Sequence, residues 1–221
     1  MFFSKKAFKY FSALGLINVG FRDVEIINPY ESDETRNVVK KFYNKFYQDN
    51  NKRIFVFGIN PGRFGGGLTG ISFTDPVALR ELCGIENNLG DRKELSSKFA
   101  YTVIDDFGGT KKFFSKVFLT ALYPFALIKD GKNFNYYDKK TLADKLKPEI
   151  VQTIKTQIEF GARKDNAVLL GKKNAEYFSV INEEHKFFEN IIVLEHPRYI
   201  MQYKLKKIGF YIKKYIDAIS N

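Results

Sequence analysis

Two side chains that could carry out chemistry, Asn60 and His196, each stand shortly after an apolar run of the chain. Asn60 lies in a glycine-rich segment that follows residues 54–57, and His196 follows residues 191–194. Each run has the composition of a strand that is buried on both faces. α/β proteins build sites from polar groups fixed at strand ends within an apolar concavity. We therefore expect the glycine-rich segment to form the active site.

Several common kinds of site chemistry do not fit the residues that are present. Residues 65–70 match the dinucleotide pattern G-x-G-x-x-G, but that pattern needs its first glycine at the strand end and its last inside a helix. Here the strand ends well before Gly65, and we expect no helix to begin before about residue 74. The sequence contains neither a Walker A motif nor the G-x-S-x-G motif of a nucleophilic serine. One cysteine and two widely spaced histidines provide no set of metal ligands, so we expect no metal and no cofactor.

Each candidate residue also has an ordinary structural interpretation. Asn60 precedes Pro61, and an Asn-Pro pair commonly makes an Asx-turn. Phe73 could simply pack in the core of a chain that contains 23 Phe and 13 Tyr. His196 could hydrogen-bond a carbonyl group in a strand-end loop, whereas His185 lies in a charged stretch and is expected to face solvent. The residue types alone leave these alternatives open.

The elements that would position these residues alternate regularly along the chain. Short apolar runs predict four strands, at residues 54–57, 117–122, 167–170 and 191–194. Helical spacing predicts helices at residues 3–14, 34–48, 76–83, 97–107, 139–160, 172–180 and 205–219, with residues 1–50 forming an N-terminal helical cap. This alternation predicts parallel strands with right-handed crossovers, and hence a three-layer α/β/α sandwich with a central four-stranded parallel sheet. Because ligands bind beyond the carboxyl ends of such strands, Asn60 and His196 should lie at the same edge.

Length and composition fit one domain that spans residues 1–221. The single cysteine, Cys83, suits a reducing compartment, and no segment approaches the roughly 18 unbroken apolar residues of a membrane span. The N-terminus lacks the features of a signal peptide, so we expect a cytoplasmic protein. The formal net charge of +11 favours polyanions, nucleic acid first, although a generally lysine-rich surface would give the same value.

The motifs and their order resemble those of one enzyme family. Gly58-Ile-Asn-Pro-Gly-Arg-Phe-Gly65, followed by Thr69-Gly-Ile-Ser-Phe73, resembles the G-M-N-P-G-x-F-G and T-G-V-P-F motif of the single-strand-selective monofunctional uracil-DNA glycosylases. Three later segments are similar, in the same order, to that family's F-F-x-x-C-F-V-x-N-x-C-P strand, G-x-x-x-A-E helix start and H-P-S-P-R loop. These segments are residues 113–124, 171–176 and 195–198. The likeness extends from about residue 53 to residue 200.

The resemblance implies a role for each part of the site. The damaged nucleotide would be flipped out of the DNA stack into a pocket, where Phe73 would stack on its base. Asn60 would position water for attack at C1′ of the sugar, and His196 would hydrogen-bond the negative charge on the departing base. Backbone groups of Ile59 and Gly62 would contact the base. No lysine is placed to form a Schiff base, so the enzyme would be monofunctional.

Two departures from the family pattern bear on specificity and on DNA binding. The family's base-reading asparagine corresponds to Ala121, whose methyl group cannot pair with a base, and the adjacent Thr120 should point to the opposite face. We therefore expect broader or altered specificity, including deaminated purines or oxidised pyrimidines. The chain also departs from the family sequence in the loop after His196. The residues expected to wedge the duplex open or to contact the DNA backbone are Arg63, Arg198, Tyr199, Ile200, Met201 and Lys204.

These observations predict a cytoplasmic, monomeric DNA glycosylase that hydrolyses the N-glycosidic bond of uracil or a related damaged base in base-excision repair. It would act on DNA, single- or double-stranded, without a cofactor. Two other functions also fit the sequence. One is a catalytically inactive nucleic-acid-binding protein of the same fold, and the other is an α/β enzyme that acts on free nucleosides or nucleotides.

Overall fold

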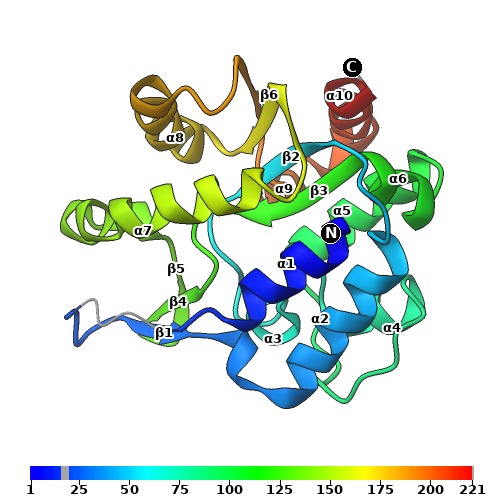
Figure 1. Cartoon of the computed structure of the whole chain (residues 1–221), viewed down its shortest axis with the longest axis horizontal. Helices are drawn as coiled ribbons and strands as arrows, with labels where there is room; N and C mark the ends of the chain where they lie inside the picture. The colour runs from blue at the N-terminus through cyan, green and yellow to red at the C-terminus, as the bar shows by residue number, and fades with distance from the viewer. Residues whose placement is uncertain (16–19, 221) are drawn as a thin grey trace.

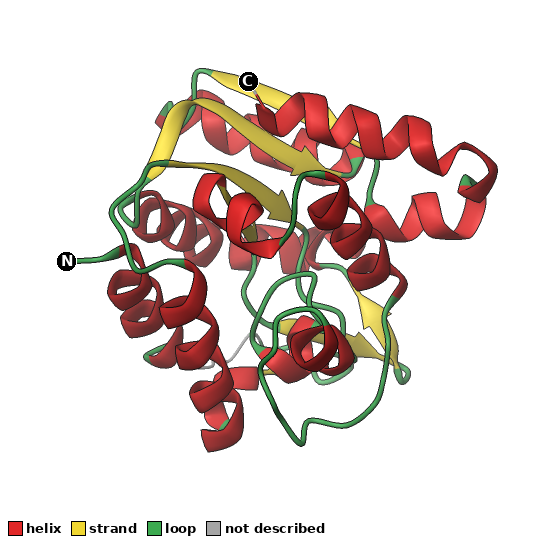
Figure 2. Ribbon diagram, turned by 90° about the vertical axis from the view of Figure 1, so that its right-hand side faces the viewer, coloured by secondary structure: helices red, strands yellow, loops and turns green. Residues whose placement is uncertain are grey.

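The central sheet consists of the four parallel strands that the sequence predicts. The computed structural model describes residues 1–15 and 20–220. The strands lie side by side in the order β3-β2-β6-β7, and helices cover both faces of the sheet (Figure 1, Figure 2). They are β2 (Arg53–Gly58), β3 (Val117–Ala121), β6 (Ala162–Leu170) and β7 (Asn190–Leu194). The predicted three-layer α/β/α sandwich is therefore confirmed.

Side-chain caps mark the starts of helices α2 and α4. Ser32 accepts a hydrogen bond from the backbone N–H of Thr35 at the start of α2. Asp75 caps α4 in the same way, and Pro76 occupies the first position of that helix. The helices are α1 (Phe3–Ser12), α2 (Asp33–Phe46), α3 (Gly66–Thr69), α4 (Pro76–Glu81), α5 (Leu95–Asp106), α6 (Thr110–Lys116), α7 (Lys140–Ile158), α8 (Lys172–His185), α9 (Pro197–Tyr203) and α10 (Ile208–Ser220), with 3-10 turns η1 (Pro29–Glu31), η2 (Tyr136–Asp138) and η3 (Leu205–Lys207).

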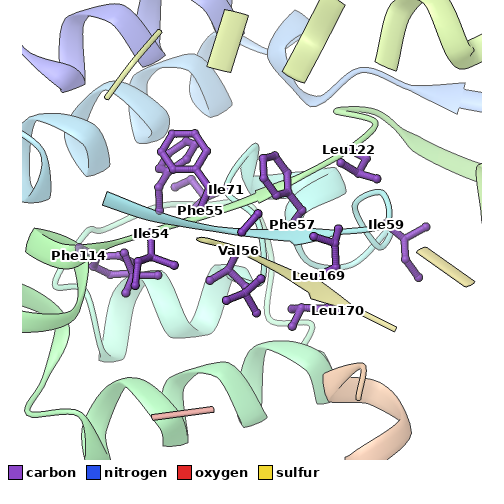
Figure 3. Packing of buried hydrophobic residues seen from close by; sticks show 14 of the residues in the cluster. Ile54, Phe55, Val56, Phe57, Ile59, Ile71, Phe114, Leu122, Leu169 and Leu170 are labelled. Carbon is purple, nitrogen blue, oxygen red and sulfur yellow. The ribbon is translucent and has the colours of Figure 1, made fainter. Parts of the chain in front are cut away.

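The two faces of β2 pack against different helices, as Figure 3 shows for the side chains around it. Phe55 and Phe57 project to one side, where Phe178 of α8 stacks on Phe57 with ring centroids 5.6 Å apart. Val56 projects to the other side, toward side chains of α5 and α10. Every residue of β2 is buried. The strand that leads into Asn60 is thus held on both faces.

A second sheet, which the sequence analysis does not predict, joins a strand near the N-terminus to a hairpin that follows β3. Its antiparallel strands β1 (Glu25–Ile27), β4 (Ala126–Lys129) and β5 (Lys132–Phe134) lie in the order β1-β4-β5. Strands this short give little periodic signal. The turn between β4 and β5 is Asp130-Gly131, with φ angles of +50° and +66°. An Asp-Gly pair is typical of a two-residue hairpin turn, and it was the available sequence signal.

Three short helices correct the predicted assignment. α3 begins at Gly66, so the expectation of no helix before about residue 74 is wrong: the glycine-rich backbone closes one turn there. The segment 113–124 resembles a strand motif of the family, but its first residues belong to α6 and only residues 117–121 form the strand β3. α9 replaces the loop expected after His196, because His196 caps it and Pro197 has the backbone angle of a first helical residue.

Candidate functional site

A cavity of about 650 Å³ opens beyond the carboxyl ends of β2, β3 and β7. Parallel strands place their carboxyl ends at one edge of a sheet. Asn60 after β2, Ala121 at the end of β3 and His196 after β7 therefore reach the same cavity. The structure thus brings together the residues that the strand order predicts to be neighbours. The other predicted residues on the cavity wall are Ile59, Gly62, Arg63, Phe73, Arg198 and Tyr199.

The half-buried amide of Asn60 is fixed by a segment distant in sequence. Its Nδ2 donates a hydrogen bond to the carbonyl oxygen of Phe134 at 3.0 Å. Its Oδ1 accepts one from the backbone N–H of Tyr136 at 3.4 Å. These partners lie 74 and 76 positions away, whereas an Asx-turn bonds backbone two residues on. The amide is therefore oriented by tertiary structure and not by its own turn.

His196 lies at the start of α9 with one ring nitrogen engaged. Its Nδ1 accepts a hydrogen bond from the backbone N–H of Arg198 at 3.2 Å. Burial, together with the nearby charge of Arg198, lowers the pKa of His196 to about 4. The ring is therefore neutral at pH 7, and an imidazole whose Nδ1 accepts carries its proton on Nε2. His196 thus bonds a backbone N–H, not the carbonyl of the alternative interpretation, and it offers the cavity an N–H donor.

The ring of Phe73 lies over the end of β2. A Cβ atom added to Gly58 would lie 2.6 Å from Cζ of Phe73, so the ring occupies the space that a side chain at position 58 would need. Phe73 has a φ angle of +56°, which is uncommon for a residue other than glycine. Its ring centroid lies 6.0 Å from that of His196. Phe73 is therefore a half-buried wall of the cavity as well as a neighbour of the core.

Ala121 presents only a methyl group to the cavity. It pairs in register with Gly58 at the end of β3 and is buried. The adjacent Thr120 points to the other face of the sheet, where its hydroxyl donates to Oε1 of Gln157 on α7. Thr120 therefore does not replace the amide that Ala121 lacks, as expected from the alternation of a strand.

One wall of the cavity comes from the unpredicted hairpin. Lys132, Asn133, Asn135 and Tyr137, from β5 and the start of η2, line the cavity beside the glycine-rich segment. Asn133 Oδ1 accepts a hydrogen bond from the backbone N–H of Arg63 at 3.1 Å, and the guanidinium of Arg63 donates to the carbonyl of Gly131. The hairpin thus holds the glycine-rich segment as well as facing the cavity.

A second support that the sequence analysis missed is Glu94, the residue before α5. Burial raises the pKa of Glu94, while hydrogen bonds from the backbone N–H groups of Phe64 and Gly65 act in the opposite direction. A Cβ atom on Gly62 or Gly65 would collide with its carboxylate. The glycines at these two positions therefore allow the carboxylate to approach the backbone closely. No local pattern marks Glu94 in the sequence.

Helix α9 divides the predicted DNA-contacting residues into two groups. Ile200 and Met201 are buried, so the wedge role expected for them is corrected: on a helix they turn inward, toward the core. Tyr199 and Tyr203, one helical turn apart, are exposed, line the cavity and contact each other with ring centroids 5.5 Å apart. Lys204 Nζ lies 5.7 Å from the Tyr199 ring. Tyr203, which the sequence analysis does not name, is therefore a residue of the cavity wall, whereas Ile200 and Met201 are not.

The described residues also bear on metal binding and on membrane insertion. Within residues 1–15 and 20–220, no group of His, Cys, Asp and Glu side chains is placed to hold a metal ion. His185 is exposed, as predicted. Among the helices of the described ranges, none combines the length and the apolar character needed to cross a membrane.

Known protein families and solved structures include ones that are similar to this chain. The family model of the uracil DNA glycosylase superfamily matches residues 44–220. The crystal structure of wild-type SMUG2 from Pedobacter heparinus is similar to this chain, with 38% sequence identity and a TM-score of 0.95. The similarity covers 100% of this chain and 97% of that one. No curated protein matches the chain.

Proposed function

The chain belongs to the uracil DNA glycosylase superfamily, and we propose that it is a monofunctional DNA glycosylase acting in base-excision repair. Its substrate would be a flipped-out uracil or a related damaged base in DNA. The observation that supports this most directly is the convergence of Asn60, Phe73 and His196 on one cavity of about 650 Å³. That volume lies in the range of pockets that enclose small ligands, and a flipped nucleotide is a ligand of this kind.

In the proposed reaction, the bond between C1′ of the sugar and the base nitrogen breaks first. Its electron pair leaves with the base, which becomes an anion until it takes a proton from solvent. Phe73 stacks on the base, while Nε2–H of His196 donates a hydrogen bond to the oxygen on which the negative charge develops. A preorganised donor of this type lowers a barrier by about 3 kcal/mol.

Water then attacks C1′, and Asn60 orients it. Oδ1 of an amide has two lone pairs, of which the backbone N–H of Tyr136 uses one. The second lone pair accepts a hydrogen bond from the water. An amide is not a strong base, so it acts by orientation, and this suffices because the glycosidic bond has already broken. The water oxygen becomes bonded to C1′, and its surplus proton passes to solvent.

We propose that the pocket accepts more than one base. Ala121 provides no hydrogen bond, Asn133 uses its Oδ1 to bind the backbone N–H of Arg63, and Asn135 uses its Nδ2 to bind Asp138. A pocket rejects wrong ligands strongly only when a ligand leaves its buried polar groups unpaired. Deaminated purines such as hypoxanthine and xanthine are therefore expected beside uracil.

The rim of the cavity provides contacts of the kind that DNA needs. Arg198 is exposed and suits a phosphate, and the exposed rings of Tyr199 and Tyr203 suit the bases that flank the flipped nucleotide. Lys204 would add a contact to the DNA backbone beside them. We propose that the protein acts on DNA as a cytoplasmic monomer without a cofactor.

Excision from synthetic DNA tests the proposal. Single- and double-stranded oligonucleotides carrying uracil, hypoxanthine, xanthine or 5-hydroxymethyluracil are incubated with the protein, and abasic sites are then cleaved with alkali. We expect product from uracil and from at least one deaminated purine. Asn60→Ala and His196→Ala should each lower the single-turnover rate by about 100-fold or more. His185→Ala, which changes the exposed histidine outside the cavity wall, is the matched control.

Other outcomes separate the remaining functions. Binding of oligonucleotides without abasic product on any substrate would indicate an inactive nucleic-acid-binding protein. Cleavage of free nucleosides without excision from oligonucleotides would indicate an enzyme of nucleoside metabolism. Either result would overturn the proposed function.

A further inference from the structure

We propose that Asn174 and Tyr136 are positioning residues that fix the amide of Asn60. Hydrogen bonds join Asn60 to Tyr136, Tyr136 to Asn174 and Asn174 to Phe57, and the backbone from Phe57 to Asn60 closes the ring. The inference rests on the proposed function, because it takes the role of Asn60 to be the orientation of water. Both residues are completely buried, and neither belongs to the cavity wall. They would act through Asn60 and not by contact with DNA.

One side of the ring anchors the strand that carries Asn60. Asn174 lies in the first turn of α8, and its Nδ2 donates a hydrogen bond to the carbonyl oxygen of Phe57 at 3.2 Å. Phe57 belongs to β2 and precedes Asn60 by only three positions. Asn174 therefore fixes the backbone from which the catalytic amide extends.

The other side of the ring anchors the segment that holds the amide. The hydroxyl of Tyr136 donates to Oδ1 of the same Asn174 at 2.8 Å. The backbone N–H of Tyr136 donates to Oδ1 of Asn60, and the neighbouring carbonyl of Phe134 accepts from Nδ2 of Asn60. Both ends of the Asn60 amide are thus bound to a segment that Asn174 holds in place.

This arrangement gives Asn174 a task that an apolar residue could not perform. Its amide donor and its amide acceptor each bind a different segment, so it sets the position of η2 relative to the end of β2. The hairpin that leads into η2 has a three-residue last strand whose Lys132 and Asn133 are exposed, so packing alone holds it weakly. A displacement of about 1 Å at a positioning group can cost about 100-fold in rate. A buried tether is a physical way to prevent such a displacement.

The experiment compares two buried tyrosines whose hydroxyl groups donate hydrogen bonds to different partners, Asn174 and Val117. Tyr136→Phe removes the hydroxyl that bonds Asn174. Tyr47→Phe removes a similarly buried hydroxyl, which donates to the carbonyl of Val117 at 3.3 Å at the opposite end of β3. Both variants should lose a similar amount of thermal stability. Only Tyr136→Phe should lower kcat, by about 10-fold or more, with KM on a uracil-containing oligonucleotide changed less than about twofold.

A double-mutant cycle identifies the route of the effect. If Tyr136 acts through Asn60, Tyr136→Phe should cause no further loss of rate in the Asn60→Ala background. Asn174→Leu has a similar volume but loses both the acceptor for Tyr136 and the donor to Phe57, so it should show the same pattern. That variant decides the matter if Tyr136→Phe does not fold.

The outcomes separate this inference from the function on which it rests. Equal rates for Tyr136→Phe and Tyr47→Phe, or fully additive losses in the cycle, would overturn the positioning role. Absence of excision by the wild-type protein would overturn the proposed function instead.

Discussion

At the scale of the residue, the two ring nitrogens of His196 have different tasks. Nδ1 accepts the hydrogen bond that starts α9, and this leaves the proton on Nε2, the nitrogen left for the cavity. Burial lowers the pKa of His196 to about 4 and keeps the ring neutral at pH 7. The neutral ring still carries one proton, so Nε2–H remains a hydrogen-bond donor at that pH. The cap of the helix and the donor of the site therefore depend on one protonation state.

We predict that this arrangement makes stability depend on pH. In the unfolded chain the histidine titrates near pH 6.5, and in the folded chain near pH 4. Between these values the unfolded state binds a proton that the folded state does not, so the free energy of unfolding falls as the pH falls. His196→Asn keeps a capping acceptor and cannot titrate. Urea unfolding between about pH 7 and about pH 4 should show a larger loss for the wild type, and equal losses would contradict the prediction.

At the scale of the element, predictability followed the strength of the local pattern. β2 and β7 are apolar runs, and their positions alone place Asn60 and His196 at one edge. The expected burial on both faces holds for β2 but not for β7, which is the edge strand and is only partly buried. β4 and β5 are short and owe their structure to pairing, so Asn133 and Asn135 were not expected in the cavity. Glu94 was missed for a related reason, because its contact with the glycine-rich loop arises only from tertiary packing.

Glu149 on helix α7 should make the free energy of unfolding change with pH in the direction opposite to that of His196. Glu149 Oε2 and the Tyr123 hydroxyl are both buried and have no hydrogen-bond partner among the described residues. Burial raises the pKa of Glu149 from 4.5 to about 7. Between these values the folded state holds a proton that the unfolded state lacks, so this group makes the free energy of unfolding fall as the pH rises.

Removing the carboxyl group should remove that dependence. We expect Glu149→Gln to raise the melting temperature relative to the wild type more at about pH 8 than at about pH 5. Glu183→Gln, on the exposed surface of α8, is the control. A difference between Glu149→Gln and wild type that does not change with pH would show that the buried carboxyl does not titrate in this range.

At the scale of the whole molecule, the polar groups at the two ends of β2 differ in how fully they are hydrogen-bonded within the protein. At the amino end, the buried guanidinium of Arg53 is fully engaged: it pairs with Asp49 at 2.8 Å and donates to the carbonyl of Phe114 at 2.7 Å. At the carboxyl end, Asn60 keeps a free lone pair and His196 keeps a donor for the cavity. Internal pairing stabilises one edge, while the other retains hydrogen-bonding capacity for a ligand.

The positive charge of the chain should act mainly through that second edge. The net charge of +11 predicts binding to single-stranded DNA that weakens with salt, and each phosphate contact contributes about −0.7 to the slope of log K against log salt concentration. Arg198→Ala, made in an Asn60→Ala background to prevent cleavage, should therefore make the slope shallower by about 0.7. Lys5→Ala, on the exposed side of α1, should leave it unchanged. Fluorescence anisotropy titrations with a uracil-containing oligonucleotide measure both slopes. Equal effects of the two substitutions would mean that charge acts as a diffuse property of the surface, because only a localised interface makes one cation count more than another.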